Sequence, residues 1–149
     1  MASLRDLERD LRRAKAAANA ARDRALRETA HDVVKHLQFF SSGPLSSARL
    51  AREDHPYATR HPFPRYDPSI INKQTGVFKR SWVISTINVT GHQIYVVRNI
   101  ASYAEYLEHG TWKMIARPID GPARIYAARV LERKLELYIV PALTRTLSG

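Results

Sequence analysis

Apolar residues recur every three or four positions through the first forty residues, and this spacing constrains the fold more than any other feature of the chain. The stripe consists of Leu4, Leu7, Leu11, Ala14, Ala18, Ala21 and Ala25, followed after a small step by Leu26, Ala30, Val33, Leu37 and Phe40. A spacing of three to four places side chains on one side of an α-helix, so the pattern predicts a single helix over residues 3–40. At 1.5 Å per residue it is about 55 Å long. Two interpretations stay open: the helix packs along its own domain, or it reaches a neighbouring subunit.

Residues 41–74 are of a different kind, because five of the eight prolines fall there. These are Pro44, Pro56, Pro62, Pro64 and Pro68. Proline removes backbone donors and forbids a continuous helix or a central strand. We therefore expect a long loop, with a short helix around residues 46–52. Loops of this length are uncommon in compact domains unless they have a function or are disordered. The aromatic residues of this segment favour an ordered arm in an assembly.

The pattern changes to strand after Phe78. Residues 81–90 and 93–99 are rich in β-branched and aromatic side chains, and Gly91-His92 between them predicts a hairpin turn. Apolar side chains alternate onto both faces of each strand. The hairpin is therefore expected to be covered on both sides, by a helix on one face and by something else on the other.

Two further helices follow the hairpin. A short one is predicted from Tyr103 to His109, with Ser102 and Glu105 as its capping residues and Gly110 at its end. A final helix begins at Asp120, and Pro141 is expected to kink it or end it near Tyr138. One side of that helix is predicted to hold Ile125, Ala128, Leu131, Leu135, Tyr138 and Ala142.

These elements together predict an α+β fold. A long N-terminal helix and a C-terminal helix pack with an antiparallel hairpin and a short helix, and a long Pro-rich arm interrupts the chain. The length of 149 residues suits one domain. We expect that domain to divide into the helix (1–40), the arm (41–74) and an α+β core (75–149).

The charge balance indicates an anionic partner. The chain has 24 Lys+Arg against 14 Asp+Glu, a formal net charge of +10, and nucleic acid is the usual partner of such a protein. Candidates for weak contact with DNA phosphates are Lys79, Arg80, Arg124 and Arg129. However, basic residues are spread along the chain, and Glu132 and Glu136 interleave with those of the last helix. This arrangement is more typical of a solvated helix face.

No pattern typical of catalysis or of cofactor binding is present. The chain has no Cys, which excludes disulfides, Cys-ligated zinc and a thiol nucleophile. The histidines lack metal-ligand spacing, the glycines are scattered singly, and Glu105 and Glu108 lie on one helical turn, whereas paired catalytic carboxylates flank the bond they break. We expect no catalytic, cofactor or metal site. No apolar run approaches the ~18 residues of a membrane span, so a soluble protein made inside a cell is expected, without a membrane partner.

Two stretches carry a resemblance to a known family. The first is Gln74-Thr-Gly-Val-Phe-Lys-Arg-Ser-Trp82, and the second is Ala101-Ser-Tyr-Ala-Glu-Tyr-Leu-Glu-His-Gly-Thr-Trp-Lys-Met-Ile-Ala-Arg-Pro118. With the helix that follows them, they resemble the small neck or tail-completion proteins of long-tailed bacteriophages, including those similar to minor tail protein Z. The chain departs from the family pattern at Phe78, where Leu is more usual, and after Pro118, where Ile-Asp-Gly-Pro replaces Phe-Leu.

The resemblance implies a structural virion protein of the phage neck, assembled in the host cytoplasm. Its partners are expected to be further copies of itself in a ring, a hexamer or a dodecamer, the adjacent head-connector and tail-tube proteins, and DNA in transit without sequence-specific binding. The motif residues that the resemblance suggests for subunit interfaces are Thr75, Gly76, Ser81, Trp82, Tyr103, Tyr106, Glu108, Gly110, Thr111, Met114, Arg117 and Pro118. In physical terms, Thr75-Gly76 suits a tight turn, and Tyr103 and Tyr106 are expected to pack on the sheet. The alternatives are a basic nucleic-acid-binding module and an enzyme with an unfamiliar site.

Overall fold

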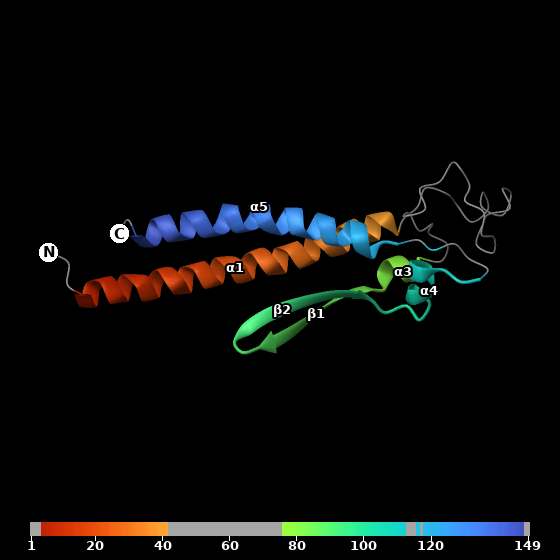
Figure 1. Ribbon diagram of the computed structural model, residues 1–149, viewed down its shortest axis with the longest axis horizontal. Coiled ribbons are helices and arrows are strands. Elements are labelled where there is room, and N and C mark those ends of the chain that lie inside the picture. Colours follow the sequence, from red (N-terminus) through yellow and green to blue (C-terminus); the bar gives the residue numbers. More distant parts are fainter. Residues whose placement is uncertain (1–3, 42–75, 113–115, 117, 148–149) are drawn as a thin grey trace.

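The computed structural model describes residues 4–41, 76–112, 116 and 118–147 (Figure 1). Its elements are α1 (Leu4–Phe40), α3 (Val77–Arg80), β1 (Trp82–Val89), β2 (His92–Asn99), α4 (Ala104–His109) and α5 (Asp120–Leu147). The predicted α+β fold is confirmed, with its long N-terminal helix, antiparallel hairpin, short helix and C-terminal helix. The Pro-rich arm, with its expected helix at residues 46–52, lies outside the described residues.

Two long helices, α1 and α5, pack against each other along much of the molecule. In Figure 1, α1 and α5 run antiparallel and side by side, so that the two chain ends lie at the same end of the structure. The side of α1 that faces α5 includes Ala14, Ala21 and Ala25, all buried. Small side chains at intervals of four and seven let two helices approach closely. From Ala14 onward, α1 therefore packs along its own chain.

The first turns of α1 have no such cover. α1 has 37 residues and α5 has 28, and Figure 1 shows α1 projecting beyond the C-terminal end of α5. Leu4, Leu7 and Leu11 lie on this projecting segment and are 87%, 55% and 58% exposed. We call residues 4–13 the overhang. The first interpretation of the long helix is thus confirmed from Ala14 onward, where α1 packs on its own chain. That its first turns reach a neighbouring subunit stays a prediction.

A polar cluster joins the two long helices near their middle. Lys134 Nζ on α5 lies 2.6 Å from Asp32 Oδ2 and 3.6 Å from Glu28 Oε2 on α1. The Tyr138 hydroxyl donates a hydrogen bond to Glu28, and the Arg24 guanidinium lies 4.4 Å from the centre of the Tyr138 ring. These contacts fix the register of α5 on α1, because a shift of either helix by one turn separates all of them.

The hairpin lies along the second half of α1 (Figure 1). β1 and β2 pair antiparallel in the register Trp82↔Asn99 to Val89↔His92. The turn consists of Thr90 and Gly91, with φ of 47° and 80°, rather than the predicted Gly91-His92. Positive φ at both central residues is what a type I′ turn requires, and this turn matches the twist of the two strands.

The hairpin is not covered on both sides as predicted. Its half near Trp82 packs against α1, but near the turn Ile87, Val89 and Ile94 are each 44–49% exposed. Within the described residues the sheet has two strands only. A two-stranded hairpin gains little stability without packing, so its α1-facing half holds it in place and its distal half offers apolar surface.

The main core lies where α1, α3, α4 and the start of α5 meet. Its fully buried members are Val33, Leu37, Phe78, Leu107 and Ile119. Partly buried side chains from the hairpin and α5, including Trp82, Val97 and Tyr126, pack around them. The core therefore sits at the end of the molecule opposite the overhang.

Two helix boundaries differ from prediction. The residue at the N-cap of α4 is Tyr103, which makes no side-chain cap, so the predicted capping roles of Ser102 and Glu105 are wrong. α5 does not end near Tyr138 but continues through Pro141 to Leu147. Proline in a helix loses one backbone hydrogen bond. Half-buried side chains beyond it, Ala142 and Leu143, continue the face of α5 that packs on α1, and this packing offsets the loss.

The predicted buried side of α5 is confirmed at Leu131, Leu135, Tyr138 and Ala142, which are half-buried, and is wrong at Ile125 and Ala128, which are exposed. In the first turns Ala123 and Ala127 are half-buried instead, at intervals of four that continue to Leu131. Intervals of four also recur on the buried side of α1, which is typical of helices whose i±4 ridges interlock. None of the helices in the described ranges is both long and apolar enough to cross a lipid bilayer.

Candidate functional site

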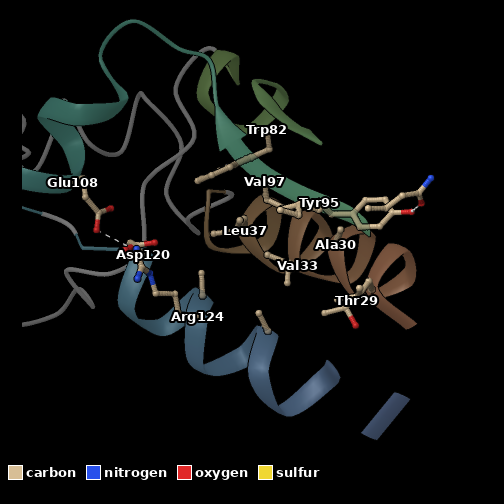
Figure 2. A pocket seen from close by; sticks show the side chains of 15 residues that line it. Thr29, Ala30, Val33, Leu37, Trp82, Tyr95, Val97, Glu108, Asp120 and Arg124 are labelled. Carbon is tan, nitrogen blue, oxygen red and sulfur yellow. Dashed lines mark hydrogen bonds and ion pairs between the residues drawn. The ribbon is translucent and has the colours of Figure 1, made fainter. Parts of the chain in front are cut away.

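A groove of about 480 Å³ runs between the hairpin and the N-terminal part of α5. Its floor is α1, one wall is β2 together with Trp82, and the other wall is the first two turns of α5 (Figure 2). This arrangement follows from the fold, because the hairpin and α5 both pack on α1 without closing on each other. The volume falls within the range of about 300–1,000 Å³ that is usual for binding sites.

The middle of the groove is apolar. Figure 2 shows Ala30, Val33 and Leu37 along the floor, with Val97 and Trp82 on the hairpin above them. Ile94, also part of the wall, is 46% exposed. An apolar groove open to solvent on a folded chain marks a surface that a partner can cover.

Charged groups form one end of the groove. Both carboxylate oxygens of Glu108, on α4, accept hydrogen bonds from backbone N–H groups at the start of α5: Oε2 from Ile119 at 2.9 Å and Oε1 from Asp120 at 3.1 Å. Asp120 in turn lies 2.8 Å from Arg124 Nε. The N-terminal N–H groups of a helix lack intrahelical partners and favour negative charge. Glu108 thus joins the short helix to the last one.

One polar atom in the lining is buried without a partner. Thr29 is 6% exposed, and its Oγ1 makes no hydrogen bond within the described residues. Burying an unpaired hydroxyl costs about 1–3 kcal/mol. The floor of the groove therefore contains a group that α1 and α5 alone do not satisfy.

The residues suggested by the first motif hold the hairpin to its neighbours. Gly76, with φ of 76°, is the N-cap of α3, and Ser81 Oγ donates to the Val77 carbonyl at 2.8 Å. Trp82 Nε1 donates to Ser41 Oγ at 3.0 Å and its ring meets Phe78 edge-on. All of these contacts lie within the chain, and of these residues Trp82 alone lines the groove.

Some residues of the second motif make contacts within the chain, whereas others are exposed. Gly110 ends α4 with φ of 73°, and its N–H donates to the Tyr106 carbonyl at 2.9 Å. Tyr106 is 57% exposed, so the expectation that both tyrosines pack on the sheet is wrong for Tyr106. The Tyr103 ring lies 6.1 Å from that of Phe78, which belongs to α3 and not to the sheet. In a helix of six residues, Leu107 takes the core-facing position instead.

The other motif residues lie between α4 and α5 or outside the described residues. Thr111 is half-buried and Pro118 is exposed, both on the connection between α4 and α5. Thr75, Met114 and Arg117 lie outside the described residues. Of the described motif residues, Trp82 and Glu108 line the groove.

The suggested DNA contacts come from two helices. Lys79 and Arg80 lie on α3, just before β1, whereas Arg124 lies on α5 at the groove and pairs with Asp120. Arg129 is exposed on α5. Lys134, which the sequence places on the basic side of the same helix, is 16% exposed and bound to Asp32. Ion pairing within the chain thus reduces the positive charge that α5 offers to phosphates.

No group of three or more potential metal ligands gathers within the described parts of the chain. His36 stacks on Tyr126 with ring centres 3.8 Å apart, and burial lowers the pKa of its imidazole. His31 is exposed, so the two histidines of α1 point in different directions. His36 serves as a packing residue between α1 and α5.

Sequence reasoning missed several residues that shape the site. Ser41 is 2% exposed and binds both Trp82 Nε1 and the Leu37 carbonyl, although it begins the Pro-rich segment. Ile119 is 3% exposed, at the point where the chain departs from the family pattern. The cluster around Glu28 and Lys134 was also missed. No local pattern signals it, because its members are about a hundred residues apart and each resembles a solvated helix charge.

Comparison with known proteins gives no relative: no family model, curated protein or solved structure matches this chain.

Proposed function

We propose that this chain is a structural, non-enzymatic protein of the neck of a long-tailed bacteriophage. In this proposal it forms a homo-oligomeric ring, a hexamer or a dodecamer, between the head connector and the tail tube, through which DNA passes. The observation that carries the proposal is the apolar surface that the chain leaves uncovered: the overhang, the distal hairpin and the groove. The resemblance in the two motifs supplies the phage context.

The distribution of exposed apolar side chains supports self-association. Large side chains are more than 40% exposed on α1, on both strands and on α5, where Leu137 and Val140 are each 60% exposed. Single exposed residues are normal on a monomer, but apolar surface gathered on separate elements is typical of a subunit. The hairpin adds two strand edges, which natural proteins seldom leave unprotected.

The order of the elements supports the same assignment. A long helix, a hairpin entered through a Gly-containing turn, a short helix that ends at Gly110, and a last helix follow one another as the resemblance implies. Glu108, from the middle of the second motif, has a defined task in this order, since it caps α5.

The charge is better explained by protein neighbours than by DNA. A lumen that binds phosphates tightly would impede the sliding of DNA, and α5 already pairs Arg124 and Lys134 within the chain. Affinity for DNA that depends on many Lys and Arg contacts falls steeply with salt. We therefore expect the remaining basic residues to face acidic surfaces of adjacent subunits or rings.

The test is a mass determination by light scattering, at two salt concentrations, with and without tail-tube protein. A hexamer or larger ring, formed alone or induced by the tube, is the expected result. A monomer that ignores the tube and binds DNA in a salt-dependent manner would contradict the proposal and favour the nucleic-acid-binding module.

A further inference from the structure

We propose that the overhang of one copy docks, as a helix, into the groove of the next copy. This inference deepens the proposed function, on which it rests, by naming the two surfaces that join neighbouring subunits. The occupant of the groove is thus a second copy of this chain, through its Leu4, Leu7 and Leu11.

The spacing of the three leucines suits a helix that lies in a groove. They occupy positions i, i+3 and i+7, which are the anchor positions by which an amphipathic helix enters an apolar groove. All three are more than half exposed on their own chain. The groove offers the matching chemistry, with Ala30 and Val33 on its floor and the half-exposed Ile94 on its wall.

The charges beside the two surfaces are complementary. On the overhang, one flank of the leucine stripe holds Arg5, Glu8 and Arg12, of which Glu8 pairs with Arg12, so that this flank has an excess of positive charge. The charged end of the groove presents the carboxylates of Glu108 and Asp120, with Arg124 as the single cation among the lining residues. A basic helix flank therefore meets a groove end with an excess of negative charge, which favours one orientation of docking.

The positions of the two surfaces on the molecule lead to a ring. Leu7 and Ala30 are about 35 Å apart along α1 at 1.5 Å per residue, so no chain can fill its own groove with its own overhang. Contact between two different patches is heterologous, and repeated heterologous contacts produce closed rings or open filaments. Each subunit thus has the two different surfaces, overhang and groove, that a ring of heterologous contacts requires.

Disulfide trapping tests the contact directly, because the chain has no cysteine of its own. Leu7→Cys and Ala123→Cys place one thiol on the overhang and one on the groove wall. A mixture of the two single variants should give disulfide-linked heterodimers. The double variant should give a series of disulfide-linked oligomers, the largest of which has as many subunits as the ring. Arg9→Cys, on the opposite side of the overhang, is the matched control and should link at least tenfold less.

A second pair of variants tests the energetics. Leu7→Asp/Leu11→Asp should convert the oligomer seen by light scattering to a monomer, with unchanged helix content by circular dichroism. Ala16→Asp/Ala20→Asp adds the same charge to exposed positions on the other side of α1, and should leave the oligomer intact.

Other results separate this inference from the function it rests on. If the wild-type chain and Leu7→Asp/Leu11→Asp both form a ring, the proposed docking is wrong, whereas the proposal of a ring is supported. If Leu7→Cys alone forms dimers and does not link to Ala123→Cys, the overhangs pair with each other and the docking is again wrong. A wild-type chain that is monomeric with and without tail-tube protein overturns both.

Discussion

Trp82 Nε1 donates a hydrogen bond of 3.0 Å to Ser41 Oγ, across 41 residues of sequence. This bond joins the first residue of β1 to the residue that follows α1. Ser41 is 2% exposed and its hydroxyl donates in turn to the Leu37 carbonyl. The hairpin and the long helix are therefore connected by a buried polar contact as well as by apolar packing.

Ser41→Ala should destabilise the chain because it leaves the indole N–H of Trp82 without an acceptor in a partly buried place. An unsatisfied buried donor costs about 1–3 kcal/mol. Urea unfolding followed by tryptophan fluorescence measures the change. Ser85→Ala, at a half-buried strand position, is the control and should change the free energy of unfolding by less than about 0.5 kcal/mol.

Glu108→Ala should destabilise the start of α5, because the carboxylate accepts hydrogen bonds from the N–H groups of Ile119 and Asp120. Loss of a helix cap costs about 0.5–2 kcal/mol. Glu105→Ala is a matched control on the same helix, since Glu105 is exposed. Equal effects of the two substitutions, measured by thermal unfolding, would contradict the capping role of Glu108.

The architecture was predictable because its helices and strands have strong periodic patterns. The stripe of α1 and the β-branched runs of the hairpin are of that kind. The prediction failed where packing decides between near-equal alternatives, as when α5 continues through Pro141. In the same way, Leu107 rather than Tyr106 faces the core, since a short helix has room for one such side chain.

The groove could not have been predicted from local patterns. It results from the way the hairpin and α5 both pack on α1, and its lining residues come from five separate elements. Trp82 and Glu108 were chosen through the resemblance, and the structure places both at the groove. Thr29, Ala30 and Ile94 have no local signal, since each fits its helix or strand pattern without reference to the other walls.

Ala25→Leu tests the close contact between the two long helices. Ala25 is fully buried where α1 faces α5, so the three carbons that leucine adds to its side chain have no space to enter. Overpacking of this kind costs about 1–3 kcal/mol. Ala20→Leu, at an exposed position of the same helix, should be close to neutral, since both residues favour helix. A stable Ala25→Leu chain would show that the helices can move apart without loss.

Glu28 gives a prediction for acid pH. The hydrogen bond from the Tyr138 hydroxyl, and next the one from Arg24, lower the pKa of this carboxyl to about 2. The pKa in the folded chain is thus below the ordinary value of 4.5. The charged form is favoured by folding, and its contribution to stability is present above pH 4.5 and is lost as the pH falls toward 2.

Carboxyl chemical shifts measured during an NMR titration should give that low pKa for Glu28 in the wild-type chain. In Tyr138→Phe the pKa should rise, because the first cause of the shift is removed. Glu28→Gln should reduce the loss of stability between pH 4.5 and 2, whereas Glu132→Gln, at an exposed position of α5, should leave it unchanged. A Glu28 pKa near 4.5 in the folded chain would mean that the cluster does not hold the two helices in register in solution.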